Sequence, residues 1–86
     1  MNNHYGKIIE KFYVIQTGEN KYFTRFYSTF DYEKGKKHFN IIDEAGLYYA
    51  RQFLRKEDAE KIIKRINNID STKNPVIKTA FIGLKN

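Results

Sequence analysis

The fold of this chain is decided in residues 7–28, KIIEKFYVIQTGENKYFTRFYS, where two strand-like runs flank a short turn. β-Branched and aromatic residues dominate both runs, and such residues favour strands. The GEN between them is a turn sequence, because Gly18 or Asn20 can adopt the positive φ that a tight hairpin needs. We therefore predict a β-hairpin formed by residues 7–17 and 21–28.

The segments beyond this hairpin continue the strand pattern. TFDYEKGKK (29–37) is a polar connection around a glycine and reads as a second hairpin tip, and HFNII (38–42) predicts a third strand. LYYARQF (47–53) fits either a fourth strand or the start of a helix. PVIKTAFIGL (75–84) predicts a last strand whose proline stands at the first position, where a missing N–H is tolerated.

Residues 55–69, RKEDAEKIIKRINNI, have the periodicity of an amphipathic helix. The apolar residues that recur at helical spacing are Ala59, Ile62, Ile63, Ile66 and Ile69. Glu57 and Asp58 fall in the first turn, where the helix dipole favours negative charge. Asn67 and Asn68 are expected to end the helix in the left-handed conformation.

The element order β-β-β-(β)-α-β predicts an α+β fold, a single domain over residues 1–86. We expect a four- to five-stranded antiparallel sheet with the helix packed on one face. Strict alternation in the second strand would set Tyr22 and Phe26 against Phe23, Arg25 and Tyr27, so both faces of the sheet are apolar.

One helix covers one face only, and an uncovered apolar face usually marks an interface. We expect that face to meet a partner. A homodimer contact would satisfy the same pattern, as would folding of the N-terminal residues and the 29–37 loop over it.

The composition excludes several classes of protein. The chain has no cysteine, so it forms neither a disulfide scaffold nor a thiolate metal site. No apolar run is long enough to cross a bilayer, and no signal-peptide core precedes the first strand. We expect a cytoplasmic protein that does not associate with membranes.

No pattern of residues indicates catalysis, a cofactor or a metal site. His4 and His38 lack partners at a recognisable spacing, and phosphate-binding glycine motifs are absent. Asp31, Glu33 and His38 share one loop, but lysines lie among them and oppose a cation. We therefore expect no enzymatic activity.

The net charge of +6 permits a polyanionic partner. Lys34, Lys36 and Lys37 could contact phosphates from the hairpin tip. Tyr13, Arg25 and Tyr27 could form a platform on which bases stack, as in proteins that bind single strands. These six residues are our candidate partner-binding residues, and nucleic-acid binding is the alternative function that they suggest.

Two stretches resemble a class of small accessory proteins from phages and mobile elements of low-GC Gram-positive bacteria. The first stretch has the pattern Y-V-I-x-x-G-x-x-K-Y, carried here by Tyr13, Val14, Ile15, Gly18, Lys21 and Tyr22. The second has A-x-x-F followed by E-x-A-E-K-I, carried by Ala50, Phe53, Glu57, Ala59, Glu60, Lys61 and Ile62. The resemblance implies a non-catalytic binding module that contacts a host protein in the host cytoplasm and inhibits it, for example in a defence system. This chain is basic, which opposes mimicry of the DNA backbone.

Overall fold

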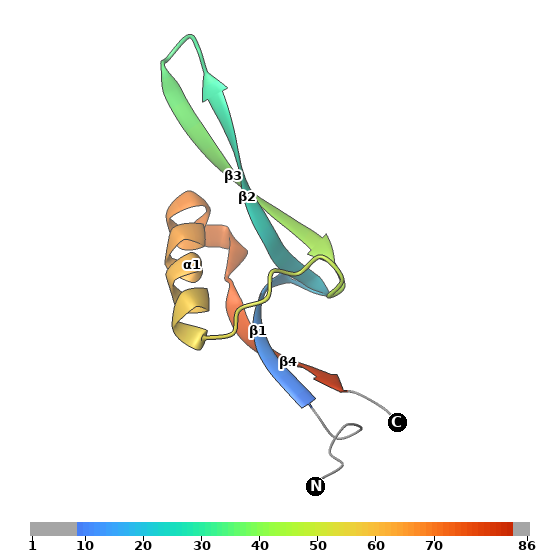
Figure 1. Ribbon diagram of the computed structural model, residues 1–86. Helices are drawn as coiled ribbons and strands as arrows, with labels where there is room; N and C mark the ends of the chain where they lie inside the picture. Colours follow the sequence, from blue (N-terminus) through green and yellow to red (C-terminus); the bar gives the residue numbers. More distant parts are fainter. Residues whose placement is uncertain (1–8, 84–86) are drawn as a thin grey trace, which may run out of the picture.

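The computed structural model describes residues 9–83, and they form an antiparallel sheet with one helix. The strands are β1 (Ile9–Gly18), β2 (Lys21–Asp31), β3 (Lys36–Ala45) and β4 (Val76–Gly83). The helix α1 (Lys56–Ile69) and a 3-10 turn, η2 (Ser71–Lys73), lie between β3 and β4 (Figure 1). The predicted α+β fold is confirmed, with four strands in the order β3-β2-β1-β4. His4 and the predicted strand residues Lys7, Ile8 and Leu84 lie outside the described residues.

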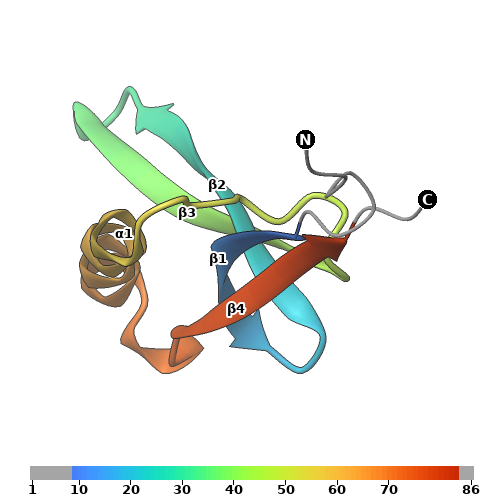
Figure 2. The ribbon, with the colours of Figure 1, turned by 60° about the horizontal axis from the view of Figure 1, so that its bottom comes forward.

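The turn between β1 and β2 follows the predicted chemistry. Asn20 adopts a φ of 53°, and Gly46 closes the same end of the hairpin by donating its N–H to the Asn20 carbonyl at 2.9 Å. Pairing between β1 and β2 then stops after two residue pairs, Gln16 with Tyr22 and Gly18 with Lys21. The sheet therefore consists of two ribbons, β1–β4 and β2–β3, which separate from one another as they leave this turn (Figures 1 and 2).

The segment between β3 and α1 fills the gap between these ribbons. Tyr13 and Phe53 exchange backbone hydrogen bonds of 2.8 and 2.9 Å, and Arg51 donates its N–H to the Phe23 carbonyl at 2.9 Å. Residues 47–53, expected as a strand or the start of a helix, form neither, apart from this single bridge at Phe53. Where β1 and β2 diverge, the connecting segment satisfies the backbone groups of Tyr13 and the carbonyl of Phe23.

The helix packs on one face of the sheet through its predicted stripe. Ala59 and Ile66 are buried against Ile15, Phe23 and Phe53, which together form the main core. The opposite face holds a smaller cluster, which consists of Phe12, Val14, Ala50 and Ala80 with Tyr22 packed beside it. The connecting segment thus covers part of the second face through Ala50.

The helix ends later than the asparagines predict. Asn67 and Asn68 are exposed and within the helix, which continues to Ile69 and ends at Asp70 in an extended conformation. Ile69, the last residue of the predicted apolar stripe, is half-buried and still helical. The left-handed residue is Asn74, with a φ of 48°, just before Pro75 and β4.

Strict alternation along β2 is also wrong. The register passes from Phe23 opposite Asp43 to Arg25 opposite Ile42, so Thr24 is an inserted residue, a β-bulge. After the bulge Phe26 lies on the helix side with Phe23, at 4.9 Å between ring centroids, and Tyr22 packs on the other side. The prediction that Phe26 shares a face with Tyr22 is therefore wrong, because Phe26 shares a face with Phe23.

Candidate binding arm

The β2–β3 hairpin extends well past the helix, and we call its outer part, residues 28–39, the arm (Figure 1). Its strands stay paired as far as Asp31 opposite Lys36. At the tip, the Asp31 carboxylate accepts the N–H groups of Glu33 at 3.0 Å and Lys34 at 3.2 Å, and Gly35 has a φ of 64°. Four residues of each strand rising about 3.3 Å each carry the tip roughly 13 Å past Ser28. The 29–37 segment therefore does not fold back over the sheet.

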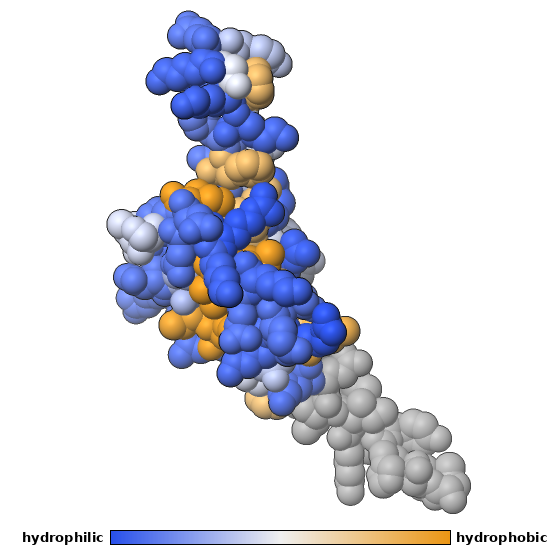
Figure 3. All heavy atoms as spheres, turned by 90° about the vertical axis from the view of Figure 1, so that its left-hand side faces the viewer, coloured by the Kyte–Doolittle hydropathy of each residue, from blue (hydrophilic) through white to orange (hydrophobic). Residues whose placement is uncertain are grey.

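The side of the arm that α1 shares carries a line of aromatic rings, which we call the aromatic stripe. Phe26, Phe39 and Phe30 follow one another on this face because Ser28 pairs with Phe39 and Phe30 with Lys37. Tyr32 at the tip meets Phe30 edge-on at 4.9 Å between centroids. Exposure rises along the line, from 39% for Phe39 to 48% for Phe30 and 88% for Tyr32. Figure 3 shows hydrophobic side chains at the base of the arm and along it.

Two cations lie over rings of the aromatic stripe. The guanidinium of Arg65, from α1, is 4.3 Å from the Phe26 centroid and 5.0 Å from that of Phe39. The ammonium of Lys37 is 5.8 Å from the Phe39 centroid. These distances are those of cation–π contacts, which hold the charged groups over the rings.

The other side of the β2–β3 hairpin is polar, both in the arm and in the part of β2 just before it. Arg25 lies 5.9 Å from the ring centroid of Tyr27, which is 47% exposed. Nearer the tip, Nε2 of His38 is 4.0 Å from an Asp31 carboxylate oxygen, and Lys36 is paired with Asp31 across the strands. This side could contact a polar or polyanionic partner.

The six sequence-predicted residues do not share one surface. Tyr13 lies on the helix side of β1, half-buried against the main core, so the sheet separates it from Arg25 and Tyr27. Among the three lysines, Lys36 lies on the polar side, Lys37 lies on the aromatic stripe, and Lys34 lies in the tip. The expected stacking platform of Tyr13 with the other two residues is thus not assembled.

Sequence reasoning missed four residues of this surface: Phe30, Tyr32, Phe39 and Arg65. Pairing β2 with β3 about Gly35 would have placed Phe30 and Phe39 on one face. Arg65 carries no local signal, because its position over Phe26 and Phe39 depends on where the helix packs.

A partly buried polar cluster lies in the body, where Asp43 is opposite Phe23. The Asp43 carboxylate accepts hydrogen bonds from the Thr17 hydroxyl at 2.8 Å and the Lys73 ammonium at 2.9 Å. Burial by itself would raise the pKa of Asp43, but the hydrogen bonds from Lys73 and Thr17 and the charges of Lys73 and Lys21 outweigh it, so the pKa is lowered. The cluster links β1, β3 and η2, and its polar groups are hydrogen-bonded to one another.

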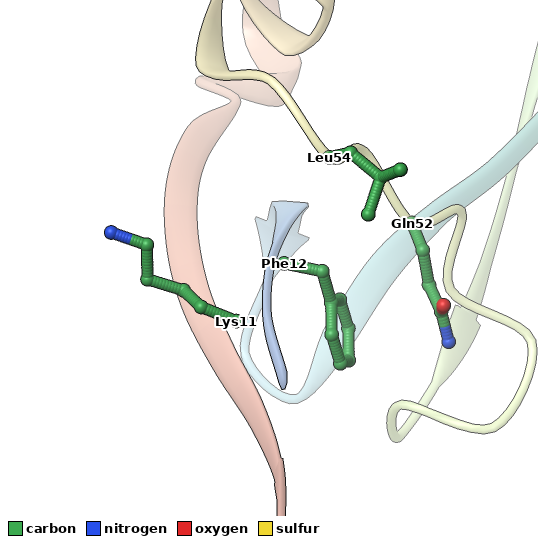
Figure 4. A pocket seen from close by; sticks show the side chains of 4 residues that line it. All are labelled: Lys11, Phe12, Gln52 and Leu54. Atoms are coloured by element: carbon green, nitrogen blue, oxygen red, sulfur yellow. The ribbon is translucent and has the colours of Figure 1, made fainter. Parts of the chain in front are cut away.

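A second exposed apolar patch lies on the connecting segment. Its members are Leu47, Tyr48, Tyr49 and Leu54. Beside it, an open hollow of about 290 Å³ is lined by Lys11, Phe12, Gln52 and Leu54. Figure 4 shows Phe12 and Gln52 on the same side of β1, with the side chain of Lys11 directed away. With Lys11 directed away, the Gln52 amide is the polar side-chain group at the hollow, and an amide by itself makes no acid–base pair.

Within residues 9–83, no group of three or more histidine, aspartate or glutamate side chains is placed to hold a metal ion. No helix in the same range is long and apolar enough to cross a membrane. Comparison with models of protein families, with curated proteins and with solved structures finds no match.

Proposed function

We propose that this chain is a non-catalytic binding module that docks on a protein partner through the aromatic stripe of its arm. The observation that supports the proposal is the exposure of Phe30 and Tyr32 on a hairpin that stands clear of the core. Large aromatic side chains are enriched at protein interfaces, where they become buried anchors.

The charge of the arm supports a protein partner over a nucleic acid. Between residues 28 and 39 the sequence has three lysines against one aspartate and one glutamate. Such a weak excess supplies few phosphate contacts, whereas the apolar rings offer area that binding would remove from water.

The specific form of this proposal is inhibition of a host protein, as in the small phage accessory proteins that the sequence resembles. A projecting arm suits stoichiometric inhibition, because it can enter a cleft of a larger protein while the body remains outside. The cytoplasm of the host cell is the compartment that this function requires.

Affinity capture from a bacterial lysate tests the proposal. The wild-type chain is compared with a Phe30→Ser, Tyr32→Ser double variant, with and without nuclease, at low and high salt. The matched control is Tyr48→Ser with Leu54→Ser, two residues of the connecting segment that are exposed at least as much as Phe30.

We expect one discrete protein that the wild type and the control retain through nuclease and high salt, and that the arm variant loses. Salt has little effect on apolar burial, so retention should persist. Equal capture by the arm variant, or recovery of nucleic acid alone, would contradict the proposal.

Nucleic-acid binding remains the second candidate, and the polar side of the arm favours it. Arg25 and Tyr27 are adjacent there, Lys36 lies farther along, and a two-stranded ribbon fits the major groove of DNA. This function predicts affinity that falls steeply with salt and weakens in Arg25→Gln and Lys36→Gln. A salt-independent interaction would exclude it.

A further inference from the structure

The strongest unexplained feature is the junction where the arm leaves the body, which we call the crook: Phe26, Phe39, Lys37 and Arg65. Two cations from different elements, Arg65 of α1 and Lys37 of β3, both lie within 6 Å of the Phe39 ring centroid. Both side chains belong to exposed residues, so neither charge is there to stabilise a buried acid.

The acidic groups of the described chain leave these two charges uncompensated. Among the side chains of residues 11–81, no carboxylate forms an ion pair with Arg65 or Lys37. The nearby acids are engaged elsewhere: Asp43 with Lys73 and Thr17, and Asp70 with Thr72. Asp31 lies on the polar side of the arm, beside His38. The charge on the aromatic side of the crook is therefore positive.

The crook also prepares Arg65 for a bidentate contact. Its guanidinium is held over two rings, so less side-chain freedom is lost when its N–H groups bind a ligand. Carboxylates and phosphates can each accept two parallel N–H···O hydrogen bonds from one guanidinium. Beside it lies an open hollow of about 340 Å³ whose lining is half polar, and its lining residues are Phe39, Asn40, Ile41, Ile69, Asp70 and Lys73.

The arrangement of the rings favours a carboxylate over the phosphate of a stacked nucleic acid. Phe39 already has two cations near it, and Phe30 and Tyr32 meet edge-on instead of presenting parallel faces to bases. A second copy of this chain is also disfavoured, because it would bring the same two cations together.

We propose that the partner presents an acidic, extended segment in which one aspartate or glutamate binds Arg65 and Lys37, while neighbouring apolar side chains cover Phe30 and Tyr32. This inference rests on the proposed function, since it names the chemistry of the partner that the arm docks on.

The test uses three probes: a soluble peptide that alternates glutamate and leucine, its lysine–leucine counterpart, and oligothymidylate. Binding to the full chain is followed by amide chemical shifts in NMR titrations. The variants are Arg65→Gln, Lys37→Gln and Arg65→Lys, with Lys64→Gln as the matched control because it removes the neighbouring charge on the exposed side of α1.

We expect the glutamate peptide to shift amides of the arm and of Arg65, and the lysine peptide not to bind. Arg65→Gln and Lys37→Gln should each lower the affinity for the glutamate peptide about tenfold, since each removes one charge-assisted contact. The affinity of Arg65→Lys should lie between those of the wild type and Arg65→Gln, because lysine keeps the charge but cannot make the bidentate contact. Lys64→Gln should bind like the wild type.

The inference is overturned if the glutamate peptide does not bind, if Arg65→Gln leaves its affinity unchanged, or if oligothymidylate competes for the same amides with higher affinity. This result is separable from the proposed function. Partner capture that needs Phe30 and Tyr32 but not Arg65 or Lys37 would keep the docking arm and remove only the acidic segment.

Discussion

At the residue scale, one inserted residue decides which aromatic side chains are core and which are surface. Thr24 shifts the alternation of β2, so that Phe26 joins Phe23 under the helix while Arg25 and Tyr27 face away. Tyr13 and Tyr27 also differ in their surroundings, although β1 and β2 have similar compositions. Tyr13 supports the core, and Tyr27 stands on the polar side of the arm.

Replacing these two tyrosines should therefore lower the stability by different amounts. We expect Tyr13→Ala to lower the free energy of unfolding by about 2–3 kcal/mol, because its ring packs against the main core. Tyr27→Ala should cost about 0.5 kcal/mol, as is usual for an exposed position. Urea unfolding followed by circular dichroism measures both. Similar losses in the two variants would show that the sheet faces are assigned incorrectly.

Asp43 should make stability depend on pH. Its pKa is below the ordinary 3.8, so the folded state takes up a proton less readily than the unfolded state. Its contribution is therefore fully present above that ordinary value and is lost as the pH falls through the lowered pKa.

Asp43→Asn should cost about 2 kcal/mol at neutral pH, because it weakens a charge-assisted pair, and the difference from the wild type should shrink in strong acid. Urea unfolding at neutral pH and near pH 3 provides the comparison, with exposed Glu44→Gln as the control. An equal difference at both pH values would mean that the charge of Asp43 is not the cause.

At the element scale, the arm is the part of the sheet least supported by the rest of the molecule. Between Phe39 and the tip, the residues of the arm pair only with each other, and neither the helix nor the connecting segment covers them. Local opening of such a hairpin requires less free energy than unfolding of the body.

Gly35→Ala should loosen the arm alone. A Cβ at this position meets no atom within 4 Å, but a φ of 64° costs an alanine about 1 kcal/mol. We expect faster amide exchange in residues 28–39 and no change in the body, with Gly35→Asn as the control because asparagine tolerates this conformation. Faster exchange throughout the chain would show that the arm and the body unfold as one unit.

At the scale of the whole molecule, two divergent ribbons are joined by a segment without regular structure. Phe53 is 6% exposed in the main core, and its backbone pairs with Tyr13. The body is therefore held together by the helix on one side and by residues 50–53 between the ribbons.

Phe53→Ala should destabilise the protein more than Tyr13→Ala or Asp43→Asn does. We expect a loss of about 3–4 kcal/mol, a large fraction of the stability of a small domain. Its neighbour Leu54 is 83% exposed, and Leu54→Ala should change little. Thermal unfolding of the two variants tests this, and comparable melting temperatures would contradict the role of the connecting segment.

The sequence by itself determined the local elements. The run of β-branched and aromatic residues, the GEN turn, the glycine at the arm tip and the apolar stripe of α1 are each properties of neighbouring residues, so the α+β fold could be predicted from them. The prediction that Asn67 and Asn68 end the helix in the left-handed conformation was wrong, because both are helical and the chain leaves the helix at Asp70 in an extended conformation.

Only the tertiary structure decided the surface. The bulge at Thr24 depends on strand register. Two further contacts join residues far apart in the chain: Phe53 pairs with Tyr13, and Arg65 lies over Phe26 and Phe39. A local pattern does not encode such contacts, because the free energy that selects them comes from burying the whole core at once. The candidate site therefore moved from a mixed platform that included Tyr13 to an aromatic stripe on the arm.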